Sequence, residues 1–481
     1  MNEKFYITTP IYYANQKPHI GTAYTNIAAD VLARYHRLIE DEVFFLTGTD
    51  EHGEKIAKAA NEAGKEPQEF VDEISESFKT AWKKLNISYD EFIRTTSEKH
   101  KDGVAGFINK LKESGNIYQD EYRGLYCSGC EDFVAKKDLT EEGKCPYHQK
   151  EPELVSESNY FFNLKKFLPE IEKKIKQEEI EIEPKERKSE VLSLLKQNLG
   201  NFSISRQKVK WGIPLPFDRS QNLYVWVDAL ANYITAIGYQ DESVKFNNFW
   251  PADMHLLAKD ILKFHAIYWP AMLIAAGLPL PKKLFVHGFF TVEGRKMSKS
   301  IGNVLDPVEL ADRYGVDALR YFVLREIPFG HDGDFSVNRL KERYNADLAN
   351  GLGNLVARTL TLAEKAQINS HNFEIRDESL MNKLGEIKKR YDKALGQVNF
   401  YEALESVWEL IGFCDEFLEK NKPWELIKQN TDKAKLVLID LLSILNAISQ
   451  LIQPFMPETS DKIDDQLKQI KKTETLFPRI D

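Results

Sequence analysis

The chain has few cysteines and no long uninterrupted hydrophobic run. Its 481 residues include four cysteines, and residues 1–5 lack the apolar core of a signal peptide. Both absences argue against a secreted, disulfide-stabilised protein, so we expect a cytoplasmic protein in a reducing compartment. The most apolar late segment, 436–452, carries Asp440, Asn446 and Gln450, which predicts a core helix and excludes a membrane span.

The chain also lacks an excess of positive charge. Lys and Arg number 65 against 74 Asp and Glu, which gives a formal net charge of −9 and a pI of about 5.8. A nucleic-acid partner would therefore have to bind local basic patches on an acidic background. Hydrophobic residues make up 42% of the sequence, enough for substantial cores, and the length suits roughly three domains of a large enzyme.

Hydrophobic patterning divides the chain into an α/β part and a helical part. Two apolar runs, 5–8 and 43–46, flank a helical pattern from Ala23 to Arg37, which is a βαβ start. The pattern changes in the middle of the chain, and amphipathic helix dominates the C-terminal part. We predict a Rossmann-type catalytic domain with an insertion, followed by an all-α helical bundle. The predicted boundaries are 1–112 and 223–284 for the catalytic halves, 113–222 for the insertion, 285–340 for a region with a basic loop, and 341–481 for the bundle.

Two separated motifs suit the binding of phosphates. The first, Pro18-His19-Ile20-Gly21-Thr22, lies directly ahead of the predicted helix, where backbone N–H groups favour phosphate. The second, Lys296-Met297-Ser298-Lys299-Ser300, supplies positive charge. Attack on the α-phosphate of ATP builds charge that cations and dipoles stabilise. Alone, each motif is more simply a helix-start histidine or a solvated basic loop, but their joint presence favours the catalytic interpretation.

Together the two motifs resemble the HIGH and KMSKS signatures of class I aminoacyl-tRNA synthetases. The chain departs from the family at Thr22, where a second histidine is usual; a threonine hydroxyl can donate to a phosphate oxygen but carries no charge. The resemblance implies that His19, Lys296 and Lys299 are catalytic. It also implies that ATP, accompanied by Mg²⁺, is bound by His19, Gly21, Thr22, Lys296, Ser298, Lys299 and Ser300.

Three of the four cysteines and one histidine form a metal-binding pattern. Cys127 and Cys130 make a C-x₂-C motif, and Cys145 and His148 supply a second pair. Four such donors suit a tetrahedral zinc ion, because each short loop presents two ligands to it. The pattern is far in sequence from both phosphate motifs, so we expect one structural zinc per chain in preference to a catalytic one. The alternative is free thiols and a surface histidine. Cys414, in a helical pattern, is expected to be a buried core thiol.

The remaining motifs narrow the resemblance to the methionyl-tRNA synthetases. The match extends from Lys4 to Asp481, and the chain has no room for a large separate editing domain. The motifs are Thr8-Thr9-Pro10-Ile11-Tyr12-Tyr13-Ala14-Asn15, Gly48-Thr49-Asp50-Glu51-His52-Gly53, Ile204-Ser205-Arg206 ahead of Trp211-Gly212-Ile213-Pro214, Tyr224-Val225-Trp226-Val227-Asp228-Ala229 ahead of Asn232-Tyr233, and Lys259-Asp260-Ile261 ahead of Phe264-His265-Ala266-Ile267-Tyr268-Trp269-Pro270.

The family resemblance implies a pocket for methionine. An aromatic and aliphatic pocket suits a polarizable thioether, and a carboxylate such as Asp50 suits the substrate ammonium. A hydroxyl from Tyr13 and a ring nitrogen from His265 would distinguish sulfur from a methylene group. Taken alone, Trp226, Tyr233 or Trp269 could equally be a core aromatic, and Asp50 could be a helix N-cap. The implied pocket residues are Ile11, Tyr13, Asp50, Trp226, Ala229, Tyr233 and His265.

The helical bundle is expected to bind the anticodon of tRNA. Asn354 and Arg358 are four residues apart, so they share one helix face, and Pro423 and Trp424 lie in a motif that resembles the family's anticodon side. Unstacked bases stack on aromatic rings and are read along their edges by polar side chains. The simpler alternative places Trp424 in a core and Arg358 in a surface ion pair.

These observations predict an enzyme that joins methionine to tRNA(Met), including the initiator tRNA, through methionyl-adenylate. Its expected partners are ATP, methionine and tRNA. We expect a monomer, because no C-terminal dimerisation module follows the bundle in this sequence, and we expect no membrane association. The alternatives are another class I synthetase and a synthetase-derived RNA-binding protein without catalysis.

Overall fold

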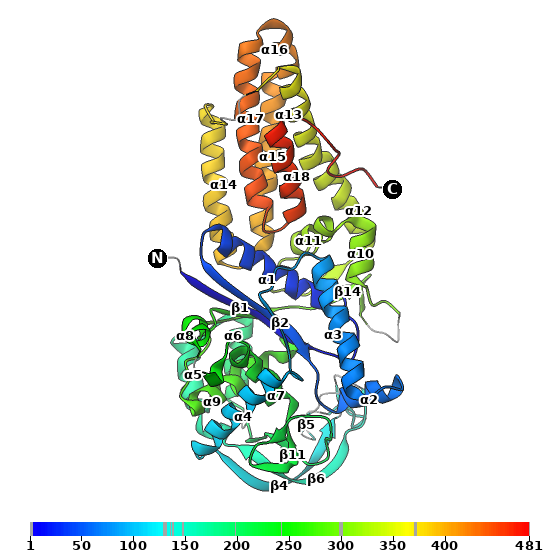
Figure 1. Cartoon of the computed structure of the whole chain (residues 1–481), viewed down its shortest axis with the longest axis vertical. Coiled ribbons are helices and arrows are strands. Elements are labelled where there is room, and N and C mark those ends of the chain that lie inside the picture. Colours follow the sequence, from blue (N-terminus) through cyan, green and yellow to red (C-terminus); the bar gives the residue numbers. More distant parts are fainter. Residues whose placement is uncertain are drawn as a thin grey trace. The chain divides into compact units, whose positions relative to one another are not determined.

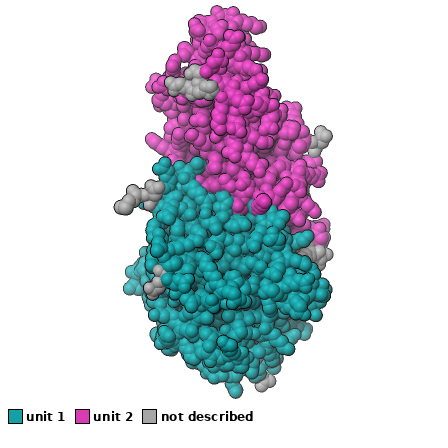
Figure 2. Space-filling model, viewed as in Figure 1, with its two compact units in different colours: residues 1–18, 36–82, 88–287 teal, residues 19–35, 83–87, 288–481 magenta. Residues whose placement is uncertain are grey.

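The chain forms two compact units. The computed structural model describes residues 3–127, 132–134, 136, 139–146, 149–197, 199–241, 243–297, 302–369 and 373–480. Unit 1 comprises residues 1–18, 36–82 and 88–287, and unit 2 comprises residues 19–35, 83–87 and 288–481 (Figure 2). Most of the first long helix, α1 (Ile20–Leu38), therefore belongs to unit 2, whereas the strands before and after it belong to unit 1.

A six-stranded parallel sheet forms the centre of unit 1 (Figure 1). Its most central strands are apolar because both faces are covered: residues 5–10 are all buried. The predicted βαβ start is confirmed by the first two strands and α1. The strand order is β3 (Glu91–Arg94), β2 (Glu42–Asp50), β1 (Lys4–Tyr13), β12 (Met254–Ala258), β13 (Lys283–His287) and β7 (Glu181–Glu183).

Helices surround this sheet and carry residues of the site. The residue before α4, Ser97, accepts a hydrogen bond from the backbone of His100 and caps that helix. The helices of unit 1 are α2 (Glu54–Glu62), α3 (Pro67–Lys84, whose last two residues belong to unit 2), α4 (Glu98–Glu113), α5 (Leu168–Lys176), α6 (Lys185–Leu195), α7 (Val225–Thr235), α8 (Val244–Phe249), a π-helical turn η5 (Phe264–Tyr268) and α9 (Trp269–Ala276), with short 3-10 turns at Leu164–Lys166, Tyr239–Asp241 and Lys259–Ile261.

The range predicted as an insertion, 113–222, contributes to more than one sheet. Its antiparallel strands form one sheet, but β7 from the same range pairs in parallel with β13 and so completes the central sheet. The antiparallel sheet has the order β5 (Asp132–Val134), β4 (Ile117–Cys127), β6 (Glu153–Phe162) and β8 (Phe202–Ser203), and a small sheet has the order β10 (Pro214–Leu215), β11 (Asp218–Leu223) and β9 (Ser205–Arg206).

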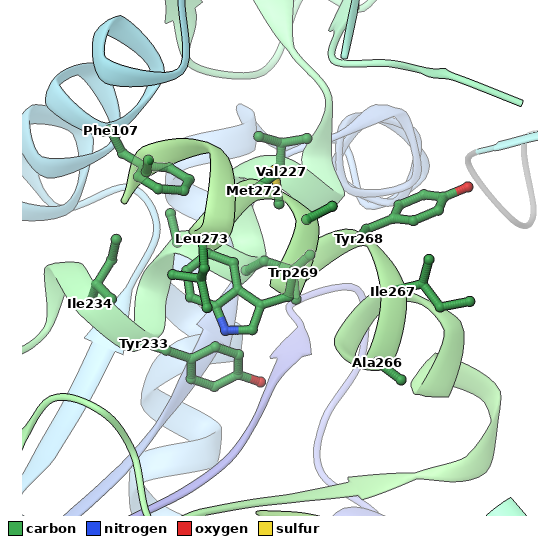
Figure 3. Packing of buried hydrophobic residues seen from close by; sticks show 14 of the residues in the cluster. Phe107, Val227, Tyr233, Ile234, Ala266, Ile267, Tyr268, Trp269, Met272 and Leu273 are labelled. Atoms are coloured by element: carbon green, nitrogen blue, oxygen red, sulfur yellow. The ribbon is translucent and has the colours of Figure 1, made fainter. Parts of the chain in front are cut away.

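The core of unit 1 gathers around Trp269, at the start of α9. Its side chain is fully buried, and its ring centroid lies 5.8 Å from that of Phe107 and 6.1 Å from that of Tyr233 (Figure 3). Trp269 is therefore a core aromatic. Because Tyr233 lies on α7, this packing also fixes the position of that helix.

Unit 2 is mainly helical, as predicted for the C-terminal part. Long helices run side by side in Figure 1, and Cys414 is buried among them, as expected. The helices are α10 (Pro307–Tyr314), α11 (Val316–Arg325), α12 (Val337–Arg343), the π-helical segment η6 (Tyr344–Gly353), α13 (Asn354–Lys365), α14 (Glu378–Gly396), α15 (Phe400–Asn421), α16 (Pro423–Gln429), α17 (Thr431–Ile452) and α18 (Pro457–Gln469). A small sheet of β15 (Arg295–Lys296), β14 (Phe290–Val292) and β16 (Gly333–Phe335) completes the unit.

Two buried features stabilise unit 2. Arg320 on α11 and Asp30 on α1 are both fully buried and lie 2.7 Å apart, and the guanidinium also donates to the main-chain oxygens of Leu85, Pro454 and Phe455. These bonds satisfy the buried charge and hold α1 in place. Helix α17 is long and apolar enough to span a membrane. However, 72% of its most apolar 18-residue stretch is buried inside the protein, so α17 is the predicted core helix.

Candidate functional site

A first candidate site lies at the carboxyl edge of the central sheet in unit 1. The order of the strands along the chain reverses beside β1, which pairs with β12 at Ile7 and Thr8 but with β2 as far as Tyr13. Strands β1 and β12 thus stop pairing before β1 ends. In open α/β sheets, such a reversal point at the carboxyl ends of strands is where ligands bind. The end of β1 carries Ile11 and Tyr13, both half-buried.

Aromatic rings gather beside the end of β1. The ring of Tyr13 lies edge-on to Trp226 of α7 with centroids 6.2 Å apart, and Trp226 stacks on Phe264 at 3.8 Å. The buried Nε1 of Trp226 has no hydrogen-bond partner among the described residues. Phe264 is not among the predicted pocket residues, although it begins the sequence motif that runs from Phe264 to Pro270.

Tyr233 and His265 form a buried hydrogen-bonded pair. The Nδ1 of His265 lies 2.9 Å from the carbonyl oxygen of Ile261, so this nitrogen must carry the proton and donate. The Nε2 of His265 lies 2.7 Å from the hydroxyl of Tyr233 and accepts from it. Burial lowers the pKa of His265 to about 4, so the imidazole is neutral at pH 7. Both ring nitrogens are thus engaged within the protein.

Asp50 is the last residue of β2 and lies opposite Tyr13 in the register of the two strands. Its side chain is 4% exposed. Helix α2 begins only at Glu54 with Gly53 as its N-cap, so the alternative of Asp50 as a helix N-cap is wrong. The carboxylate is therefore placed at the sheet edge by the strand itself.

All seven predicted methionine-pocket residues lie in unit 1, on four elements of the fold. Ile11 and Tyr13 end β1, Asp50 ends β2, and Trp226, Ala229 and Tyr233 lie on α7, while His265 lies in η5. The contacts described above join Tyr13 to Trp226 and Tyr233 to His265. Ala229 is buried on the same helix as its predicted partners.

A separate pocket of about 550 Å³ opens near the loop that follows Asp50. It is lined by Tyr126, Arg206, Lys208, Lys210 and Trp211, among others, and by none of the seven predicted methionine-pocket residues. Trp211 connects it to the loop, because its Nε1 donates to the carbonyl oxygen of Glu51 at 2.6 Å.

A second candidate site, the first phosphate motif, lies at the start of helix α1 in unit 2. His19 is the N-cap: its Nδ1 accepts the backbone N–H of Gly21 at 3.1 Å. Thr22 completes the cap, because its hydroxyl accepts the N–H of His19 at 3.1 Å and donates to the His19 carbonyl at 2.8 Å. In the neutral imidazole the proton is then on Nε2.

Met297 of the basic motif and Leu305, which follows that motif, lie close to this helix start within unit 2. The N–H of Ile20 donates to the carbonyl oxygen of Leu305 at 3.0 Å. A Cβ atom added to Gly21 would lie 3.0 Å from Cε1 of His19 and 3.6 Å from Cε of Met297, so glycine leaves room for both side chains. Lys296 ends β15, which pairs with β14. The predicted residues Ser298, Lys299 and Ser300 lie outside the described residues.

Two of the four predicted zinc ligands are described. Cys127 ends β4 and Cys145 is held in a turn by main-chain bonds to Gln149 and Lys150; both cysteines are buried. Cys130 and His148 lie outside the described residues. No metal-binding group of three or more acidic, histidine or cysteine side chains occurs among those that are described, a set that includes only half of the predicted ligands.

The four predicted anticodon residues lie on two neighbouring helices of unit 2. Asn354 is exposed at the start of α13, and Arg358 lies one turn later, while Pro423 and the half-buried Trp424 begin α16. The guanidinium of Arg358 lies 5.6 Å from the Trp424 ring centroid and 2.7 Å from a carboxylate oxygen of Glu419. Arg358 therefore does form the surface ion pair of the simpler alternative, and it also contacts Trp424.

Comparison with known families agrees with this arrangement. Residues 5–153 and 142–360 match the profile of the tRNA synthetases class I (M), and residues 369–479 match the anticodon binding domain of methionyl tRNA ligase. The fold of unit 1, the capped signature helix and the helical bundle thus define a class I aminoacyl-tRNA synthetase.

Individual relatives narrow the class to one family. Methionine–tRNA ligases of Caldanaerobacter subterraneus and Rickettsia conorii are 45% and 43% identical to the chain over all of its length, which corresponds to 80% and 96% of theirs. Mycobacterium tuberculosis methionyl-tRNA synthetase in complex with methionyl-adenylate matches 99% of the chain and 100% of its own, with a TM-score of 0.94 and 36% identity. The chain belongs to the methionyl-tRNA synthetase family.

Proposed function

We propose that the chain ligates methionine to tRNA, with the amino acid bound in unit 1 and the phosphates of ATP bound by the signature residues of unit 2. The observation that carries the proposal is the convergence of the two phosphate motifs. The N–H of Ile20 bonds to Leu305 just beyond the basic loop, and Met297 lies beside Gly21. Two motifs more than 270 residues apart thereby meet at one helix N-terminus.

In unit 1 the methionine side chain would lie against the aromatic wall of Tyr13 and Trp226. Ile11 and Ala229 would supply its aliphatic surface, and Asp50 would accept hydrogen bonds from the ammonium group. Since the Tyr233 hydroxyl donates its hydrogen bond to His265, it is not free to donate to the substrate. We therefore assign this pair to shaping the floor of the pocket. The Tyr13 hydroxyl is then the candidate for recognising sulfur.

In unit 2 the charge of the nucleotide would be stabilised by dipoles and cations. The Nε2–H of His19 and the N-terminus of α1 would donate hydrogen bonds to phosphate oxygens. Lys296 and Lys299 would stabilise the negative charge that develops on the departing pyrophosphate. Ser298 and Ser300 would add hydroxyl donors. Gly21 keeps the imidazole close to the helix, and Thr22 acts by capping it. Mg²⁺ would accompany ATP and would neutralise part of the phosphate charge.

The reaction proceeds in two transfers. The methionine carboxylate attacks the α-phosphorus of ATP, which forms methionyl-adenylate and releases pyrophosphate. A hydroxyl of the terminal ribose of tRNA then attacks the methionyl carbonyl carbon, loses its proton and releases AMP. Positioning and electrostatic stabilisation supply most of the catalysis of the first transfer.

The tRNA(Met) substrate, the initiator form included, would be recognised at its anticodon by unit 2. The ring of Trp424 would stack on an unpaired base, and Asn354 and Arg358 would bond to base edges. Pro423 is buried and fixes the start of α16. Because Arg358 is already paired with the exposed Glu419, a base would compete with that carboxylate.

A structural zinc ion would be held by Cys127, Cys130, Cys145 and His148. The two described ligands fit this role, because both are buried and the backbone of Cys145 is held by main-chain hydrogen bonds to Gln149 and Lys150. Thiolate and imidazole donors suit tetrahedral zinc, which would fix the tip of the β4–β6 sheet. We further propose that the protein acts as a monomer in the cytoplasm.

The proposal is tested by ATP–pyrophosphate exchange measured separately with each of the twenty amino acids. Methionine alone should support rapid exchange. Rapid exchange with another amino acid would indicate a different class I synthetase, and no exchange with any of them would indicate a non-catalytic RNA-binding protein.

A further inference from the structure

A buried carboxylate joins three elements of unit 1 behind the methionine pocket. Asp228 of α7 is 1% exposed, and its two oxygens accept hydrogen bonds from two histidines. The Nδ1 of His52 lies 2.8 Å from Oδ2, and the Nε2 of His100 lies 2.7 Å from Oδ1. His52 belongs to the loop after β2, and His100 belongs to α4.

His100 fixes the rotation of α7. Its Nε2 bonds to Asp228 and its Nδ1 lies 2.7 Å from the hydroxyl of Thr235, which is seven residues further along the same helix. One imidazole thus spans two turns on one face of α7. The helices approach closely at this point, because a Cβ atom added to Gly103 of α4 would lie 2.6 Å from Cγ2 of Thr235.

The other face of α7 carries residues of the methionine pocket. Trp226, Ala229 and Tyr233 are spaced three and four residues apart, so they share a stripe along the helix. Any rotation of α7 would move all three together. The bonds of His100 to Asp228 and Thr235 oppose that rotation.

His52 connects the same carboxylate to the residue proposed to bind ammonium. It lies two residues after Asp50, and the residue between them, Glu51, is fully buried and accepts hydrogen bonds from Arg94 and Thr96. The loop after β2 is therefore held on one side by Glu51 and on the other by His52.

We propose that Asp228 is a positioning residue that holds the Asp50 loop and the aromatic face of α7 at the spacing that methionine binding requires. The inference rests on the methionine site proposed above. Asp228 acts through His52 and His100, and its role is in substrate affinity rather than in the chemical step.

Because Asp228 is ionised, each of its two carboxylate oxygens can accept a hydrogen bond from one histidine. Burial alone would raise the pKa of Asp228, but the nearby charge of His52 and the hydrogen bonds from His100 and His52 lower that pKa to about 2. An ionised carboxylate accepts at both oxygens, whereas the amide of asparagine accepts at one and donates at the other. Asp228→Asn therefore keeps the shape of the side chain but can accept a hydrogen bond from only one histidine.

The experiment compares the KM for methionine with the KM for ATP in the exchange reaction of full-length variants. Asp228→Asn should raise the KM for methionine about 10- to 100-fold, the scale expected for displaced binding groups, with the KM for ATP unchanged. His100→Gln keeps an N–H donor toward Asp228 and should be affected less than His100→Leu. This pair carries the test if Asp228→Asn does not fold.

Two comparators separate the possible failures. Asp253→Asn removes a carboxylate that bonds to the N–H of Tyr6 elsewhere in unit 1, and it should leave the KM for methionine unchanged. Asp50→Asn should raise that KM, and if it does not, the proposed methionine site is wrong. If Asp50→Asn raises it while Asp228→Asn and His100→Leu do not, or if these variants lower kcat and thermal stability alone, Asp228 is merely structural and the inference is overturned.

Discussion

The Tyr233–His265 pair shows how single atoms decide a residue's role. Sequence motifs predict that His265 lies at the pocket, but they do not specify its tautomer. The carbonyl of Ile261 sets the tautomer, and as a result the Tyr233 hydroxyl donates inward to His265. A ring nitrogen that accepts a hydrogen bond within the protein has no proton to offer to the substrate sulfur.

Tyr233→Phe tests this assignment. The change leaves the buried Nε2 of His265 without a donor, which costs about 1–3 kcal/mol in stability and should raise the KM for methionine on the order of 10-fold. The preference for methionine over norleucine, its thioether-free analogue, should be retained. The measurement is kcat/KM for both amino acids in exchange.

Tyr160→Phe is the matched control for Tyr233→Phe. It removes a hydroxyl that bonds to Asp218 in the same unit. It should leave kcat/KM unchanged for both methionine and norleucine. Loss of the preference for methionine in Tyr233→Phe would mean that this hydroxyl contacts the substrate sulfur directly.

Sequence patterning predicts the central strands well but not the network behind the pocket. The runs at 5–8 and 43–46 are rich in apolar residues because most of their side chains are buried in the central sheet. The bonds of Asp228 to His52 and His100 join residues 176 and 128 positions apart, so no local pattern reveals them.

At the scale of elements, strand β7 and the predicted zinc loops are features that local sequence patterns do not determine fully. Strand β7 is only three residues long and two of them are glutamates, so it is identified as a strand by its pairing with β13. The motifs with cysteine and histidine predict a zinc site from spacing within short loops, and this ligand set stays a prediction, because Cys130 and His148 lie outside the described residues.

Cys145→Ser tests the zinc proposal. The wild-type chain should contain about one zinc ion, since four ligands close one tetrahedral site. The variant should lose zinc and become more sensitive to proteolysis in the range 113–222, because the metal stabilises the local fold. Elemental analysis and limited proteolysis are the measurements.

Cys414→Ser is a suitable control for the metal content. Cys414 is buried in unit 2, and burial raises the pKa of its thiol to about 12, so it is not a candidate ligand. Full zinc occupancy in Cys145→Ser would show that the ligand set is wrong.

At the scale of the whole molecule, the two units are proposed to have different tasks. The residues of the proposed methionine pocket all belong to unit 1, whereas the signature residues His19, Gly21 and Thr22 belong to unit 2 with the anticodon-binding bundle. Methionine activation needs no tRNA, so damage at the anticodon side should affect only the transfer to tRNA. We therefore expect methionine activation and anticodon recognition to be separable by mutation.

Trp424→Ala is the most direct test, with ATP–pyrophosphate exchange and tRNA methionylation measured on one folded preparation. Loss of base stacking should cost about 1–3 kcal/mol in tRNA binding and lower the efficiency of methionylation accordingly, while exchange stays at the wild-type rate. Trp424→Phe should recover part of the loss, because it retains an aromatic face. If Trp424→Ala lost exchange together with methionylation, the separation of the two tasks would be contradicted and Trp424 would be a core residue. If methionylation were unchanged, the anticodon would be recognised elsewhere.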